Sequence, residues 1–384
     1  MNYIAEQMKI MIERCGSKRL CRLITDNAAA MKNAARIVRT TYPWIIATTC
    51  FCHSLDLFLC DIFKVLSIVR IFEDDLLISK TIRNGQTMKA EFTRICTDKK
   101  INVTLILPAT TRWSSHCRCL ENFTKLKKCL QLFALDSKDL SELDKKREKK
   151  NLRKIADIIM DSTFWANVDD CLSLIKPIVD VIVKIQTDEP NIHTIYPLFH
   201  QLQSNLPDIV LLSILEGEER ELVLTKLTSC REEYVTPLFC TAYRLNPCYN
   251  DLLTPDQELD VTEFISQLCE NLDMSDEKVG EVLAEFIAYK SKTGLFSKSF
   301  LWKLSKKISP IQWWENIPFK LSKISIRILS IPATSAAIER SFSHMADVQR
   351  KKRNRLQFQR VGKLTYIGFN NVLLTSPKTP KKAC

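Results

Sequence analysis

An apolar pattern with the period of an α-helix runs through residues 151–305, and it constrains the fold more than any other feature of this sequence. Apolar residues recur there at helical spacing, as at Leu172, Ile175 and Val179. A segment of about 150 residues is long enough to form a domain. We therefore expect an all-α domain in the middle of the chain.

The first hundred residues show a different pattern, in which short apolar runs alternate with helix-forming segments. Residues 2–15 and 28–38 have the character of helices, whereas residues 20–25 and 44–49 read as buried strands. Residues 101–107 form the next strand-like run. This order predicts part of an α/β sheet ahead of the helical domain.

Asp26 stands between a predicted strand and the helix that follows it. Ligands of open α/β sheets collect at the carboxyl ends of the strands, where helix N-termini also attract anions. Asp26 is therefore a candidate site residue. The alternative is that Asp26 or Asn27 only caps the helix.

A second candidate carboxylate, Glu339, lies near the C-terminus in the first turns of a helix that a Thr-Ser pair introduces. Ile338, Phe342 and Met345 have the spacing of one helix face, which we expect to be buried, with Glu339 beside it. A carboxylate beside an apolar face needs a partner. A salt bridge to Arg340 or another basic neighbour on a solvated flank is the simpler interpretation.

The net charge of +12 is concentrated at the C-terminus. Residues 340–384 hold eleven Lys and Arg residues against one acidic residue, which leaves a net charge of only +2 for the rest of the chain. Such a segment favours a polyanionic partner, most simply nucleic acid. The basic run 351–353 would serve equally well as a nuclear-import signal.

Composition excludes several classes of protein. Fifteen cysteines without a repeating spacing, and no secretory signal at the N-terminus, favour reduced thiols in the cytosol or nucleus. No apolar run is long enough to span a bilayer, so we expect no membrane partner. The seven glycines form no phosphate-binding loop, which argues against an ATPase or a dinucleotide enzyme.

Several blocks resemble one family, the hAT transposases. Residues 332–343, continued by 349–356, resemble the C-terminal dimerisation segment of that family. Residues 24–34 resemble the block that carries the second catalytic Asp, and Trp313-Trp314 resembles the pair ahead of the dimerisation segment. Cys50-x-x-His53 and Arg112-Trp113-Ser114 also occur in the family order, so the resemblance covers nearly the whole chain.

The resemblance implies a ribonuclease-H-like active site in which three carboxylates hold two divalent cations. Asp26 and Glu339 correspond to two of these carboxylates and would be both catalytic residues and Mg²⁺ ligands. The first Asp and the family's N-terminal BED-type zinc finger have no counterpart in this sequence. We therefore expect weak Mg²⁺ binding, if any, and a cofactor only where catalysis survives.

The expected DNA contacts lie in three places, two of them implied by the resemblance and the third by the charge of the tail. Trp113 follows Arg112 on a polar loop, a setting suited to stacking on a displaced base. Cys50 and His53 would brace the site or contact DNA there, since their spacing fits no standard zinc finger. The remaining contacts would come from the basic tail: Arg350, Lys351, Lys352, Arg353 and Arg355.

The expected fold class is α/β plus all-α: a partial ribonuclease-H-like mixed sheet interrupted by a large helical insertion, predominantly helical overall. Residues 1–125 would form the partial catalytic core and residues 126–309 the helical insertion domain. Residues 310–371 would form the hAT C-terminal dimerisation segment that returns to the core, followed by a disordered basic tail over 372–384.

These features predict a hAT transposon-derived nuclear protein that dimerises, or forms a higher homo-oligomer, through residues 310–371 and binds DNA with weak specificity. The incomplete carboxylate set is more consistent with a degenerate DDE-type transposase than with an active enzyme. Two alternatives remain. The chain could be a fragment or partial gene model of an active transposase, or a domesticated nuclear protein-interaction module.

Overall fold

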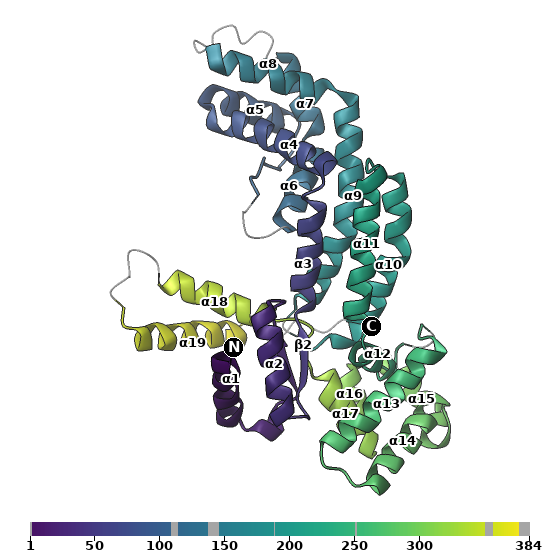
Figure 1. Cartoon of the computed structure of the whole chain (residues 1–384). Helices are drawn as coiled ribbons and strands as arrows, with labels where there is room; N and C mark the ends of the chain where they lie inside the picture. Colours follow the sequence, from purple (N-terminus) through teal and green to yellow (C-terminus); the bar gives the residue numbers. More distant parts are fainter. Residues whose placement is uncertain are drawn as a thin grey trace. The chain divides into compact units, whose positions relative to one another are not determined.

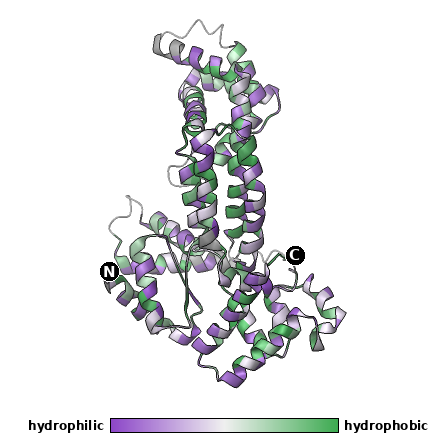
Figure 2. Ribbon diagram, turned by 45° about the vertical axis from the view of Figure 1, so that its right-hand side comes forward, coloured by the Kyte–Doolittle hydropathy of each residue, from purple (hydrophilic) through white to green (hydrophobic). Residues whose placement is uncertain are grey.

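The computed structural model describes residues 2–108, 114–136, 146–187, 189–249, 252–349 and 356–375. Within these residues the protein is predominantly helical (Figure 1). Hydrophobic residues lie along one side of many helices and hydrophilic residues along the other, as Figure 2 shows. No helix in this part of the chain is both long and apolar enough to cross a membrane.

The chain divides into two compact units. Unit 1 comprises residues 1–53, 183–199 and 233–384, and unit 2 comprises residues 54–182 and 200–232. The division passes through α3 (Phe51–Ile62) and α10 (Ile195–Leu212). The boundaries predicted at residues 125 and 309 divide the sequence by its resemblance to family segments and not by compactness. They therefore stay predictions.

Unit 1 begins with the predicted alternation of helices and strands. Gly16 follows α1 with a φ of +84°, a conformation that favours glycine. The strands are parallel, with Arg22 paired to Ile46 and Thr25 to Thr49. The elements are α1 (Asn2–Cys15), β1 (Arg22–Thr25), α2 (Ala29–Thr41) and β2 (Ile46–Thr49).

An apolar cluster holds α1 and α2 against this sheet. Ile12 of α1, Val38 of α2, and Tyr42 and Ile45 ahead of β2 are all buried together. The Tyr42 hydroxyl donates a 2.6 Å hydrogen bond to Glu13, which satisfies its polar end at the edge of the cluster. The cluster fixes the position of β1 and therefore of the residues that follow it.

The remainder of unit 1 is helical, and buried aromatic side chains form its centre. Trp313 and Trp314 of α16 are almost fully buried, and their indole N–H groups donate to the carbonyl oxygens of Leu301 and Leu245. The pair therefore anchors α16 in the core of unit 1. The helices are α12 (Pro237–Arg244), α13 (Pro255–Asn271), α14 (Asp276–Lys290), α15 (Ser299–Ser305), α16 (Pro310–Glu315), α17 (Lys320–Leu329), α18 (Ala336–Val348) and α19 (Phe358–Thr375).

Unit 2 is a set of packed helices in which aromatic pairs bridge neighbouring elements. Phe123 stacks on Trp165 with ring centroids 5.1 Å apart, and Phe92 meets Phe133 edge to face. Its remaining helices are α4 (Leu66–Asn84), α5 (Gln86–Asp98), α6 (Ser114–Lys125), α7 (Lys127–Asp136), α8 (Lys146–Met160), α9 (Ser162–Ile185) and α11 (Gly217–Tyr234).

The prediction of a strand at residues 101–107 is wrong, because residues 101–108 have no regular secondary structure. A strand needs a neighbouring strand for its backbone groups. Here the side chain of Asn122 in α6 donates to the carbonyl oxygen of Thr104 at 3.2 Å. The described residues thus contain two parallel strands, too few to define a ribonuclease-H-like mixed sheet, while the helical character that was predicted is confirmed.

Candidate functional site

Asp26 lies directly after β1, as predicted. Thr25 before it is buried, whereas Asp26 itself is exposed. One of its carboxylate oxygens accepts a hydrogen bond from the backbone N–H of Ala28 at 3.1 Å. Asp26 therefore organises the turn ahead of α2, but the helix cap itself is Ala28, without a side-chain cap hydrogen bond, so neither Asp26 nor Asn27 is the cap that the alternative interpretation expected. The Asp26 carboxylate is presented to solvent at the carboxyl end of the sheet.

Cys50 occupies the corresponding position after β2, and it joins the two strand ends. Its backbone N–H donates to the carbonyl oxygen of Thr25 at 2.8 Å, extending the parallel ladder by one bond. Its side chain is 1% exposed and stands at the start of α3. Cys50 is therefore a buried structural residue at the carboxyl edge of the sheet, beside the end of β1 that Asp26 follows.

The N-terminus of α18 is attached to the same edge. The hydroxyl and the backbone N–H of Ser335 both point at the Cys50 sulfur, at 3.2 and 3.5 Å. The Ser335 hydroxyl also lies 3.0 Å from a carboxylate oxygen of Glu339, one helical turn further on. Glu339 is exposed, like Asp26.

These contacts attach the N-terminus of α18 to the carboxyl edge of the sheet. Asp26 follows Thr25, whose carbonyl oxygen accepts a hydrogen bond from Cys50, and the Cys50 sulfur contacts Ser335, one helical turn before Glu339. More than three hundred positions separate the two carboxylates along the chain. Their catalytic role stays a prediction.

Carboxylate oxygens are the donor type that Mg²⁺ prefers. In the part of the chain that the structure describes, however, no three His, Cys, Asp or Glu side chains are grouped so that they could hold a metal ion. The described residues thus do not complete a two-metal site around Asp26 and Glu339.

Sequence reasoning missed Arg22 of β1, which links the sheet to the segment just before α18. Its guanidinium donates to the hydroxyl of Thr48 at 2.5 Å and to the carbonyl oxygen of Pro332 at 2.8 Å. Burial lowers the pKa of Arg22 to about 9, so the group is charged at neutral pH. An isolated Arg in a strand carries no signal of such a contact, because Pro332 is 310 residues away.

The other predicted DNA contacts fall into two groups. His53 is partly buried in the first turn of α3. The residues Arg112, Trp113, Arg350, Lys351, Lys352, Arg353 and Arg355 lie outside the described residues.

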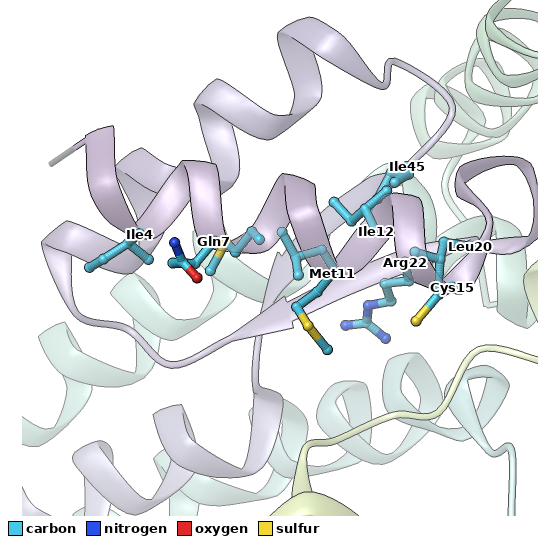
Figure 3. Close-up of a pocket in the computed structure, with 10 residues that line it drawn as sticks. Ile4, Gln7, Met11, Ile12, Cys15, Leu20, Arg22 and Ile45 are labelled. Carbon is cyan, nitrogen blue, oxygen red and sulfur yellow. The ribbon is translucent and has the colours of Figure 1, made fainter.

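A cavity of about 380 Å³ lies between α1 and β1, away from the carboxylates (Figure 3). Its walls are almost entirely apolar and include Met11, Ile12 and Leu23. Gln7 and Arg22 are its polar members. The cavity suits an apolar group and offers no nucleophile or acid–base pair.

The prediction that Ile338 and Phe342 of α18 are buried is wrong. Ile338 is 57% and Phe342 64% exposed, and Met345 is only partly buried. Helical periodicity identifies an apolar face but does not reveal whether this chain covers it. No part of the chain that the structure describes covers Ile338 and Phe342, and exposed apolar surface of this kind typically marks an interaction site.

The following helix, α19, also carries exposed apolar side chains, on more than one of its sides. It lies beside α18 (Figure 1), with Val361 and Thr365 buried on its inner side. We call the exposed set the α18–α19 apolar face; its members are Ile338, Phe342, Phe358, Leu364, Tyr366 and Ile367.

Comparison with known families places this face in a recognised region. Residues 293–370 match the hAT family C-terminal dimerisation region, which contains Glu339 and the α18–α19 apolar face. Residues 1–78 match a domain of unknown function (DUF659), which contains Asp26 and Cys50. Among curated proteins no match is found. The two matches confirm the resemblance seen in the sequence: the chain is similar to hAT-family transposases and carries the C-terminal dimerisation region of that family.

Proposed function

We propose that this protein is a hAT transposon-derived nuclear protein that self-associates through the α18–α19 apolar face and binds DNA without cutting it. The observation that carries the proposal is the exposure of Phe342 and Phe358, at 64% and 74%, inside the region matched to hAT dimerisation. An apolar surface of this kind on a soluble protein typically marks an interface.

Hydrophobic burial gives the proposed association its driving force. Full burial of one large apolar side chain contributes about 1.5–3 kcal/mol. In a two-fold symmetric dimer both copies use the same face. Each side chain that enters the interface therefore contributes once from each copy. Aromatic residues such as Phe342, Phe358 and Tyr366 are the residues most enriched in such interfaces.

Light scattering on the purified full chain tests the association. At micromolar concentration we expect the mass of a dimer or a higher homo-oligomer, and the mass of one chain would contradict the proposal.

Charge supports the proposed DNA binding and nuclear location. The basic run 351–353 lies in the net +10 segment 340–384, which suits both phosphate contacts and nuclear import. We expect affinity for DNA to fall steeply as salt rises, because bound counterions are released when lysines and arginines neutralise phosphates. Binding that does not change with salt would favour the protein-interaction alternative instead.

The proposed loss of cleavage rests on the carboxylate set at the sheet edge. Asp26 follows β1, Glu339 lies on the helix that Ser335 attaches to Cys50, and among the described residues no group of three possible metal ligands occurs. We expect no nicking of transposon-end DNA with Mg²⁺ or Mn²⁺. Metal-dependent cleavage that Glu339→Gln abolishes would instead identify an active transposase fragment, the alternative that the Cys50 contacts favour.

A further inference from the structure

A surface rich in lysine surrounds α15, well before the basic tail. Residues 286–314 contain six lysines and no acidic residue. With this segment included, residues 286–384 carry a net charge of +17 and residues 1–285 a net charge of −5. We call the exposed members the α15 lysine surface: Lys292, Lys298, Lys303, Lys306 and Lys307.

These lysines do not stabilise the fold through ion pairs. Among the described residues none of the five has a carboxylate oxygen within 4.0 Å. Nearby lysines behave differently: Lys290 pairs with Glu258, and Lys320 pairs with Glu281. The α15 lysine surface is therefore an uncompensated positive charge, which costs self-repulsion and favours an anionic partner.

The surface is held on a rigid support. Leu301 and Ser305 are the buried residues of α15 and Trp302 is partly buried, whereas Phe300, Lys303 and Leu304 are exposed. The indole N–H of Trp302 donates to the carbonyl oxygen of Phe296 at 2.7 Å, and the indole N–H of Trp313 donates to that of Leu301 at 2.8 Å. A preorganised surface loses little backbone entropy on binding.

Aromatic rings accompany the charges. Phe300 on α15 is 57% exposed between Lys298 and Lys303. The ammonium group of Lys292 lies 4.9 Å from the ring centroid of Trp302. Exposed aromatic rings set among lysines are the arrangement that proteins use to bind single-stranded nucleic acid, whose bases stack on the rings while the lysines contact phosphates.

We infer that the α15 lysine surface is a nucleic-acid-binding surface, with its lysines on the phosphate backbone and Phe300 against an unpaired base. A second copy of the same surface is not the partner, because an isologous contact would bring like charges together. The inference rests on the proposed function for the nature of the partner and adds a contact site separate from the tail.

Binding of a labelled oligo-dT of about 20 nucleotides, and of a duplex of equal length, tests this inference. The variant Lys303→Glu/Lys306→Glu/Lys307→Glu should bind the single strand at least about tenfold more weakly, with a salt slope smaller by about 2. A matched control is Lys80→Glu/Lys89→Glu/Lys99→Glu, which changes the net charge equally at exposed lysines of α4, of the first turn of α5 and of the position that follows α5. Affinity of the α15 variant equal to that of the control would overturn the inference.

Two further variants separate the possible outcomes. Phe300→Ala should weaken binding of the single strand and leave binding of the duplex unchanged. Equal effects on both probes would show that no base stacks on Phe300. Lys351→Glu/Lys352→Glu/Arg353→Glu tests the tail. If only the tail variant loses affinity, the proposed DNA binding stands and the α15 inference fails. If the wild-type chain binds neither probe, the proposed function fails together with the inference.

Discussion

The Cys50 sulfur lies 3.2 Å from the hydroxyl oxygen of Ser335 and 3.5 Å from its backbone nitrogen, although Ser335 is 285 positions further along the chain. This contact fastens the start of α18, the helix that carries Glu339, to the carboxyl edge of the two-stranded sheet.

A double-mutant cycle should detect this contact as a coupling energy. We expect Cys50→Ala and Ser335→Ala to interact by about 1 kcal/mol in the free energy of unfolding, the net value of a typical hydrogen bond. Urea unfolding of the wild type, both single variants and the double variant measures it. Cys171→Ala, at a buried cysteine of unit 2, should be additive with Ser335→Ala; additivity of the Cys50 pair as well would show that the contact contributes nothing.

The contact between α18 and α19 leaves no room for a methyl group at Gly368. A Cβ atom there would lie 2.1 Å from Nε2 of His344. We expect Gly368→Ala to destabilise the protein by about 1–3 kcal/mol, as overpacking does, and His344→Ala to relieve most of that loss.

Gly362→Ala in the same helix is the matched control for Gly368→Ala. No atom lies within 4 Å of a Cβ at Gly362, so this variant should stabilise α19 by about 0.5–1 kcal/mol through helix propensity. Thermal unfolding measures both changes. Equal effects of the two glycine substitutions would show that α19 does not pack on His344.

The buried carboxyl group of Asp75 in unit 2 should make the free energy of unfolding depend on pH. Its side chain is 2% exposed, and burial raises the pKa of Asp75 to about 7, although the Ser79 hydroxyl donates to it. Between about pH 4 and pH 7 the unfolded chain releases this proton and the folded chain keeps it. The contribution of Asp75 to stability therefore decreases as pH rises through this range, by about 1.4 kcal/mol for each unit of pKa shift.

Asp75→Asn should remove that decrease. We expect the variant to match the wild type at about pH 4 and to exceed it in unfolding free energy at pH 8, because Asn can accept the Ser79 hydrogen bond without a charge. Chemical unfolding across this range is the measurement. Glu73→Gln, at an exposed position of α4, should show no such trend, and a parallel pH profile for both variants would refute the assignment.

Local patterns were sufficient to predict much of the fold. The helix over residues 2–15, the strands around Arg22–Thr25 and Ile46–Thr49, and the burial of Trp313 and Trp314 follow from periodicity and local chemistry. Residues 101–107 have strand composition but no strand beside them, and a pairing partner is not a local property.

The candidate site was harder to predict, because its contacts join distant segments. Asp26 and Glu339 could be chosen from their positions after a strand and at a helix start. The contact between Cys50 and Ser335 and the hydrogen bond from Arg22 to Pro332 could not be predicted, because neither leaves a pattern in the local sequence. Ile338 and Phe342 show a further limit: periodicity finds an apolar face, and only a structure shows that the same chain leaves it exposed.

Self-association through the α18–α19 apolar face is the central claim, and sedimentation velocity of the full chain tests it most directly. The wild type should sediment as an oligomer at micromolar concentration, and Phe342→Asp should sediment as a monomer with unchanged helical content. Leu212→Asp, at an apolar residue of unit 2 that is 84% exposed, should remain oligomeric. A Phe342→Asp protein that stays as oligomeric as the wild type would contradict the account.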